Sequence, residues 1–278
     1  MTSRRAKPLF ALCTISHREK LLEYALDVAA ELGVEGVEIW GREPHISEKY
    51  DENRVQAARR MVEERGLVPA VLGSYLGFGL VRNRGEEVVE LEDVLHTAHC
   101  LRTPLVRVWA SDVASDQASK AVWDRTVAEA QEACDRAARL HLTLAAQMAD
   151  DTLADTSDSC RRLLDRVGRE NFRLTFQVSA RPRPETPEER LTAVLDSVVH
   201  LHLQNYEAYC PNGERVRRAS LADGVVDYYP LLERLVERGY TGYYALAFAP
   251  REGEGKRQAL AQDLSYLKSL FKLMGLKV

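Results

Sequence analysis

The stretch VVHLHLQNY, residues 198–206, alternates strictly between two faces. One face is apolar and carries Val199, Leu201 and Leu203. The other face is polar and carries His200, His202 and Gln204. Such alternation predicts a β-strand, because successive side chains of a strand point to opposite sides. If the apolar face packs under helices, the two histidines must border an enclosed polar space.

The rest of the chain repeats a strand followed by a helix, eight times in all. Short apolar runs predict strands over residues 9–15, 36–40, 69–75, 105–111, 142–148, 173–179, 198–204 and 243–249. Amphipathic patterns predict helices over residues 19–33, 51–65, 86–101, 117–139, 153–167, 186–196, 227–238 and 255–274.

Eight strand–helix units predict an α/β fold, a single (β/α)8 TIM barrel formed by one domain over residues 1–278. No composition break or linker divides the chain. The alternative is a doubly wound open sheet. That fold usually has fewer strands or a glycine-rich phosphate loop after the first strand, and residues 13–17 contain no glycine.

The polar residues of five predicted strands fall on one consistent face. These residues are Glu38, Arg107, Trp109, Gln147, Gln177, His200, His202 and Gln204. In a barrel the outward face meets helices, whereas the inward face is polar near the carboxyl ends of the strands, where active sites lie. The pattern therefore predicts that these side chains converge on one cavity.

Several of these residues also have a purely structural interpretation. Glu38 and Arg107 would then form a satisfied internal ion pair. Trp40 and Trp109 would belong to the core or to a cavity wall. His200 lies deeper in its strand than His202 and would be a hydrogen-bonded core histidine, whereas His202 is favoured as a site residue.

Composition narrows the range of partners. The formal charge is −4 from 38 basic and 42 acidic residues, mixed along the chain, which gives no reason to expect nucleic acid or an anionic membrane as partner. The five cysteines are dispersed without a CxxC pair, as in a reduced cytoplasmic protein. No segment has the length and apolarity of a membrane span, and the basic N-terminus lacks a cleavage-type signal. Self-association of the chain into a homo-oligomer is compatible with this composition.

Three further clusters are weaker candidates. His96, His99 and Cys100 have a spacing that suggests metal ligands, but they fall on one amphipathic helix and are better explained as a packed or solvated face. Glu43 and His45 follow the second strand and could belong to a lid. The basic run at residues 215–218 lies in the long loop after the seventh strand, where it is either solvated or meets an anionic substrate group such as phosphate.

Four segments resemble the xylose isomerase-like TIM-barrel superfamily, in particular its sugar phosphate isomerase/epimerase proteins. The segments are LDVAAELGVEGVEIW (residues 26–40), DTLADT (151–156), VHLH (199–202) and the run from GVVD (224–227) to GYTGY (239–243). Their order and spacing, more than any single motif, are typical of this superfamily, and the resemblance covers nearly the whole chain. It implies a barrel that carries out isomerase, epimerase or lyase chemistry on a small sugar-like molecule.

The resemblance also implies where a divalent metal would bind. The family typically uses a glutamate, an aspartate, a histidine and a glutamate on strands five to eight, and the matching residues here are Gln147, Gln177, His202 and Ala247. Two further family histidines correspond to Ala149 and Ala180. Because neutral amides and a methyl group are poor ligands for a hard cation, we expect no metal cofactor at these positions. The alternative is that a divalent metal binds with the help of Asp150 or Asp151, which requires one of them to reach inward.

The favoured function is a metal-independent isomerase, epimerase or lyase acting on a hydroxylated carbonyl compound by acid–base chemistry. Its expected catalytic residues are His202 and Glu38. The expected substrate-binding residues are Arg107, Trp109, Gln147, Gln177, Trp40, Tyr75, His200, Gln204 and Asn205. The alternatives are a non-catalytic small-molecule-binding protein and a metal-dependent isomerase with replacement ligands. A nuclease is the least favoured, because neither several zinc ligands nor a basic face is present.

Overall fold

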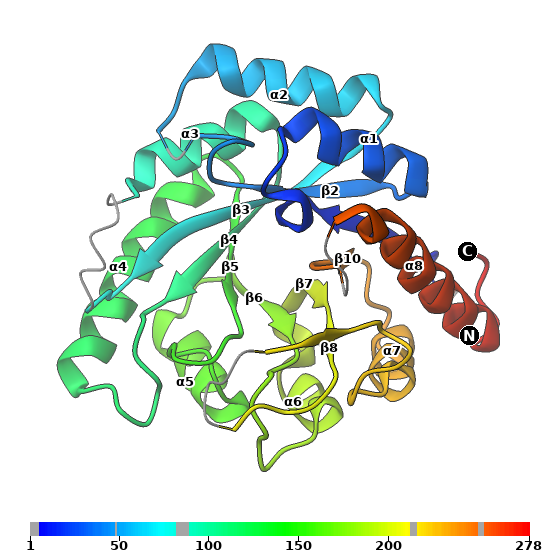
Figure 1. Ribbon diagram of the computed structural model, residues 1–278. Coiled ribbons are helices and arrows are strands. Elements are labelled where there is room, and N and C mark those ends of the chain that lie inside the picture. Colours follow the sequence, from blue (N-terminus) through cyan, green and yellow to red (C-terminus); the bar gives the residue numbers. More distant parts are fainter. Residues whose placement is uncertain (1–5, 48, 82–88, 212–215, 250–252) are drawn as a thin grey trace.

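The computed structural model is a closed barrel of eight parallel strands (Figure 1). It describes residues 6–47, 49–81, 89–211, 216–249 and 253–278. The barrel strands are β1 (Leu9–Cys13), β2 (Gly36–Trp40), β3 (Val68–Phe78), β4 (Leu105–Ala110), β5 (Thr143–Gln147), β6 (Phe172–Gln177), β7 (Val198–Leu203) and β10 (Tyr243–Leu246). Strand β1 pairs with both β2 and β10, so the predicted barrel is confirmed and the open sheet is excluded.

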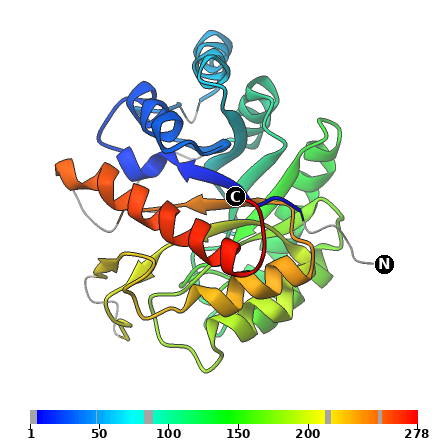
Figure 2. The same ribbon diagram turned by 90° about the vertical axis from the view of Figure 1, so that its right-hand side faces the viewer.

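Within the described residues, eight α-helices surround the strands (Figure 1). They are α1 (Leu22–Leu32), α2 (Glu52–Glu64), α3 (Leu91–Leu101), α4 (Lys120–Ala138), α5 (Ser157–Val167), α6 (Pro187–Val194), α7 (Tyr228–Glu237) and α8 (Lys256–Leu273). Helix α8 contacts both α1 and α7 and thereby closes the ring (Figure 2). No helix in the described ranges has the length and apolarity to span a membrane.

Local sequence explains several helix ends. The Asp51 side chain accepts a hydrogen bond from the Arg54 backbone N–H at the start of α2. Thr186 forms a capping box with Glu189, and Pro187 occupies the first turn of α6. Helix α1 ends at Gly33, whose φ of 67° lies in the left-handed region that favours glycine.

Strand β3 is longer than the predicted 69–75 because it pairs with β4 in two sections. Gly73 is opposite Arg107, and after a shift in register Gly77 is opposite Trp109. The shift bends β3 and lets its second section continue to Phe78. Tyr75 lies between the two paired sections.

Beyond β7 the chain forms a small hairpin. Strand β8 (Asn205–Tyr206) pairs antiparallel with β9 (Arg218–Ala219). The loop that follows β9 is fixed to α8, because the Asp263 carboxylate accepts a hydrogen bond of 2.8 Å from the Leu221 backbone N–H. Asp263 is only 2% exposed, and burial raises its pKa to about 6.

We predict that Asp263→Asn stabilises the protein at pH 7.5 but not at pH 4. The folded pKa lies above the ordinary value of about 3.9, so the protonated form is favoured by folding and stability falls as pH rises from about 4 to about 6. An asparagine keeps the acceptor oxygen without the charge. Urea unfolding should show a gain of about 2 kcal/mol at pH 7.5. Asp116→Asn, a change at an exposed position, is the control, and an equal gain at both pH values for Asp263→Asn would contradict the explanation.

Candidate active site

A buried carboxylate lies at the centre of the barrel. One oxygen of Glu38, Oε2, lies 2.9 Å from Nε2 of His200 and 2.6 Å from Nε2 of His202. The other oxygen, Oε1, lies 3.6 Å from Nε of Arg107. The side chains of Glu38 and Arg107 are each 4% exposed. The predicted convergence of strands β2, β4 and β7 on one polar cluster is therefore present.

Backbone geometry makes room for this carboxylate. A Cβ atom on Gly73 would lie 2.6 Å from Oε1 of Glu38 and 3.2 Å from Nη2 of Arg107. Only glycine at this position of β3 therefore lets the ion pair lie against the strand. From the opposite side the Cys13 thiol of β1 donates to Oε2 of Glu38 over 3.5 Å.

The Glu38 carboxylate is ionised in this setting. Burial by itself raises the pKa of Glu38, but the charge of His202 and the hydrogen bonds from His200 and His202 outweigh it and hold the pKa well below its usual value. Burial lowers the pKa of His200 despite its bond to Glu38, which favours the neutral imidazole. Burial and the Glu38 charge raise the pKa of the Cys13 thiol, so it remains protonated.

His202 lies between two acceptors. Its Nδ1 is 3.2 Å from Oε1 of Gln177, and the same oxygen accepts a hydrogen bond of 2.9 Å from Nε2 of Gln147. Nε2 of His202 faces the Glu38 carboxylate, which accepts its hydrogen bond. The ring is therefore held between a carboxylate and an amide at the edge of the cavity.

A cavity of about 120 Å³ opens above this cluster at the carboxyl ends of the strands. Its walls are formed by Cys13, Ile15, Glu38, Trp40, Tyr75, Arg107, Trp109, Gln147, His202, Ala247 and Phe248. Trp40 donates from Nε1 to the Tyr75 hydroxyl over 3.0 Å, and the Tyr75 and Trp109 rings stack at 6.3 Å. These aromatic rings form one side of the cavity and contact one another.

Two side chains of the cavity wall carry buried donor nitrogens that lack hydrogen-bond acceptors within the described residues. They are the Arg107 guanidinium, through Nε and Nη1, and the indole N–H of Trp109. The guanidinium carbon lies 5.0 Å from the Trp109 ring and 5.3 Å from the Tyr75 ring, which fix its position. Buried donors without acceptors are costly, so a ligand oxygen in the cavity would be bound favourably.

Two predicted substrate-binding residues are directed elsewhere. The expectation that Asn205 binds substrate is corrected, because its side chain is used by the backbone. Its Nδ2 donates to the backbone oxygens of Leu221 and Val226, and its Oδ1 accepts from the backbone N–H groups of Tyr206 and Val226. Gln204 donates to the Tyr206 hydroxyl over 2.6 Å and accepts from Arg218. Neither residue lines the cavity, since the chain has already turned into the β8–β9 hairpin.

His200 and Gln177 contact the cavity wall without being part of it. Each forms a hydrogen bond with a residue that lines the cavity, but neither lines the cavity itself. Sequence reasoning missed Cys13, Ile15 and Phe248. Cys13 could have been found, because Ala11 and Cys13 share one face of the first strand and the alternation test extends to that strand.

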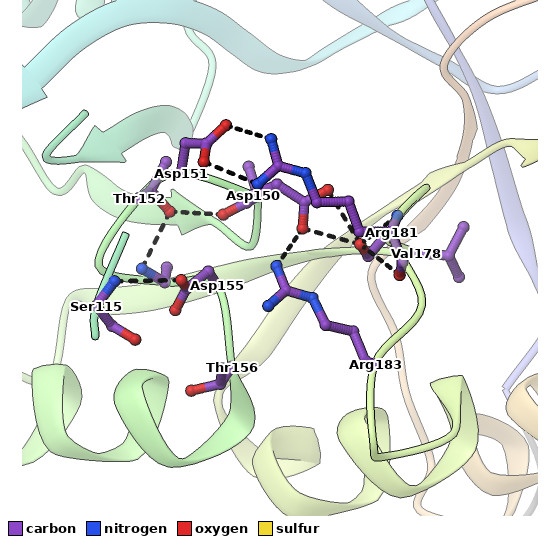
Figure 3. A network of polar contacts seen from close by, with 12 residues as sticks. Ser115, Asp150, Asp151, Thr152, Asp155, Thr156, Val178, Arg181 and Arg183 are labelled. Carbon is purple, nitrogen blue, oxygen red and sulfur yellow. Dashed lines mark hydrogen bonds and ion pairs between the residues drawn. The ribbon is translucent and has the colours of Figure 1, made fainter. Parts of the chain in front are cut away.

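Asp150 and Asp151 do not reach inward. Figure 3 shows Asp151 paired with the Arg181 guanidinium, at 2.8 and 2.7 Å, and Asp150 directed toward Arg183. Asp150 also accepts from the Ser179 hydroxyl over 2.8 Å. These contacts join the loops after β5 and β6, and neither aspartate lines the cavity.

The weaker candidates are accounted for by local contacts. His96 is exposed on α3, 3.9 Å from Glu92, and Glu43 pairs with Arg54 on the surface. His45 is buried and contacts the Thr14 hydroxyl and two backbone oxygens, so it fixes the loop after β2. Arg218 contacts Gln204 and the Phe248 ring, whereas Arg215 lies outside the described residues.

The positions implied for the family's metal do not suit a hard divalent cation. Gln147 and Gln177 bond to each other, both nitrogens of His202 are engaged, and Ala247 offers only a methyl group. A different set, Cys13, Glu38, His200 and His202, brings four potential ligand atoms within 4.8 Å of one another. Thiol and imidazole donors favour zinc-like metals over magnesium, but the nearby Arg107 already compensates the Glu38 charge.

Comparison with known proteins agrees with this fold. A family model described as xylose isomerase-like TIM barrel matches residues 26–270. The 3-dehydroshikimate dehydratase of Bacillus anthracis is 21% identical over 243 residues, which cover 81% of this chain and 86% of that protein.

Solved structures superpose over almost the full length of the chain. The D-allulose 3-epimerase from Methylomonas sp. has a TM-score of 0.74 at 16% identity, covering 96% of this chain and 100% of that one. A xylose isomerase-like TIM-barrel protein from Mycobacterium smegmatis, in complex with magnesium, has a TM-score of 0.69 at 18% identity. The superposition covers 97% of this chain and 98% of that one.

We predict that Glu38→Gln lowers the free energy of unfolding at pH 7 by about 3 kcal/mol, because it leaves the buried Arg107 charge without its partner. The depressed pKa of Glu38 means that its stabilising charge is present above about pH 4 and is lost as pH falls further. The difference in free energy of unfolding between the unaltered chain and Glu38→Gln, measured with denaturant, should therefore be smaller at pH 4 than at pH 7.

The matched control is Glu43→Gln, which breaks a surface pair at 2.8 Å and should cost less than about 1 kcal/mol. Adding Arg107→Met to Glu38→Gln should recover part of the loss, since the unpaired charge is removed. Additive effects of the two substitutions would contradict the proposed pairing.

Proposed function

The chain belongs to the xylose isomerase-like TIM-barrel family, and from that membership we propose that it is an isomerase, epimerase or lyase acting on a hydroxylated carbonyl compound. The proton transfers use His202 and Glu38, and no divalent metal takes part. The observation that carries the proposal is the 2.6 Å contact between Glu38 Oε2 and His202 Nε2 at the edge of a cavity whose wall includes Arg107 and Trp109.

The His202–Glu38 pair supplies acid and base. On substrate binding, Nδ1 of His202 exchanges its 3.2 Å contact with Gln177 for the substrate, and the neutral ring takes the proton beside the carbonyl. The imidazolium that forms then returns that proton to the product or to the departing hydroxyl. The Glu38 carboxylate stabilises this imidazolium through Nε2, while Gln177, itself held by Gln147, orients the ring before the substrate binds. The pair thereby holds a proton at a defined atom beside the substrate.

Arg107 and Trp109 hold the substrate's carbonyl oxygen. Removal of a proton beside a carbonyl places negative charge on that oxygen, and preorganised N–H donors stabilise it. Return of the proton to a different carbon or face gives an isomer or epimer, whereas loss of a protonated hydroxyl gives elimination of water. The related dehydratase and epimerase carry these two reaction types in their names.

We predict that His202→Ala lowers kcat/KM by about 10²–10⁴-fold on a substrate found by screening hydroxylated carbonyl compounds. The screen should include 3-dehydroshikimate and D-allulose, which the related enzymes' names suggest. His96→Ala, at an exposed position of α3, is the control and should retain full turnover. Full turnover by His202→Ala would remove His202 from the mechanism.

A small-molecule-binding protein without catalysis is the second candidate. The observation in its favour is the alanine series Ala245, Ala247 and Ala249 at the end of the eighth barrel strand, which leaves space without supplying a titratable group. Such a protein would be stabilised by a ligand that is recovered unchanged. Recovery of an altered product would rule out this candidate.

A third candidate retains metal chemistry through Cys13, Glu38, His200 and His202. Under the metal-independent proposal, purified protein supplemented with Mn, Co, Zn or Mg should hold none of them stoichiometrically by elemental analysis. The variant Gln147→Glu/Gln177→Asp/Ala247→Glu, which restores carboxylates at the family positions, should gain Mn²⁺ binding by calorimetry. Stoichiometric metal in the unaltered protein would reverse the assignment.

The proposed partner is a small molecule, and we expect neither nucleic acid nor a membrane to bind. The near balance of acidic and basic residues supports this expectation. The dispersed cysteines support a cytoplasmic location.

A further inference from the structure

Two loops at the carboxyl ends of the barrel strands are joined by ion pairs. They are the loop after β5, residues 148–156, and the loop after β6, residues 178–186. Asp151 and Arg181 form two hydrogen bonds of 2.8 and 2.7 Å, and Asp150 pairs with Arg183 (Figure 3). Since β5 and β6 are neighbours in the barrel, both pairs connect the ends of adjacent strands.

The same two strands end at a pair of hydrogen-bonded glutamines. Gln147 is the last residue of β5, and Gln177 is the last residue of β6. Nε2 of Gln147 donates to Oε1 of Gln177 over 2.9 Å, and that oxygen lies 3.2 Å from Nδ1 of His202. Asp151 and Arg181 each lie four residues beyond the glutamine of their own strand. The ion pair and the amide contact therefore join the same two strand ends.

The backbone of Asp151 lies in the left-handed region, with a φ of 60°. A residue with a side chain adopts this region at a cost, although aspartate does so more readily than most. In this conformation the carboxylate meets the Arg181 guanidinium, which binds both of its oxygens. A bidentate pair fixes direction as well as distance, so it favours one relative position of the two loops.

The Asp151–Arg181 pair is exposed enough to be removed without loss of the fold. The Arg181 side chain is 35% exposed, and that of Asp151 is 44% exposed. Ion pairs at such exposure contribute little to global stability, because water screens them. The effect of this pair is therefore local, on the two loops and on the strand ends that precede them.

We propose that Asp151 and Arg181 are positioning residues of the active site. Their ion pair keeps the ends of β5 and β6 together, so that Gln147 holds Gln177 and Gln177 orients the His202 ring before the substrate binds. This inference rests on the proposed function, because it gives the pair a task in the chemistry of His202. Neither Asp151 nor Arg181 lines the cavity, so loss of the pair should lower kcat with little change in KM.

The first test needs no substrate. In NMR spectra of the ¹⁵N-labelled full chain, Gln147→Met identifies the side-chain amide signals of Gln147. Arg181→Gln should speed the exchange of these amide hydrogens with water about tenfold, because the contact with Gln177 is formed less often. Asp151→Asn should have the same effect, and the two substitutions together should add little. Adding Arg183→Gln to Arg181→Gln should speed exchange further, since it removes both ion pairs.

The matched control is Arg169→Gln. Arg169 pairs with Asp135 through two hydrogen bonds of 2.6 and 3.0 Å, and the two side chains are 37% and 54% exposed. This pair lies before β6, at the amino ends of the strands, so its loss should leave the exchange of the Gln147 amide unchanged. Equal exchange rates in Arg181→Gln and the unaltered chain would overturn the proposal.

The second test is kinetic, on a substrate found by screening. Arg181→Gln should lower kcat about tenfold with KM little changed, and Arg181→Lys, which keeps the charge, should recover part of the loss. An unchanged kcat in Arg181→Gln would overturn the proposal even if amide exchange were faster. Full turnover by His202→Ala would instead remove the proposed chemistry, while amide exchange would still report whether the ion pair positions the glutamines.

Discussion

The contact on which this structure depends is between the buried Glu38 carboxylate and the groups that compensate its charge. A lone carboxylate at 3% exposure would be protonated rather than ionised. Arg107 supplies a full positive charge, and His200, His202 and Cys13 supply donors to one oxygen. A Cβ atom on Gly73 would lie 2.6 Å from Oε1 of Glu38, so a side chain there would displace the carboxylate from these partners.

The same compensation bears on the chemistry. In a metal-dependent barrel a cation both neutralises carboxylates and polarises the substrate carbonyl. Here the Arg107 guanidinium and the His202 imidazole, held by Glu38 and Gln177, lie beside the cavity, and amides occupy two of the expected ligand positions. A fixed N–H donor can stabilise negative charge on oxygen as a metal does, although with a smaller charge. The proposed metal-independent mechanism follows from this replacement of a metal cation by fixed N–H donors.

The alternation of side chains could be read directly from the sequence, and it correctly placed Glu38, Arg107, Gln147 and His202 around one space. It failed beyond the strand ends. Asn205 and Gln204 follow β7 without interruption, yet the chain turns there and both side chains are used by the β8–β9 hairpin. Periodicity cannot report such a turn, because it describes a strand only while the strand continues.

By itself, then, the sequence determined the barrel and the inward face of its strands, because the hydrophobic periods of strands and helices are local properties of the chain. The tertiary structure decided how deep each polar side chain lies in the barrel and which residues it contacts. Register across neighbouring strands placed His200 below His202, brought Cys13 to Glu38 and required a glycine opposite Arg107. It also tied Asp150 and Asp151 to arginines of the next loop. These contacts join residues as much as 164 positions apart, so no local pattern encodes them.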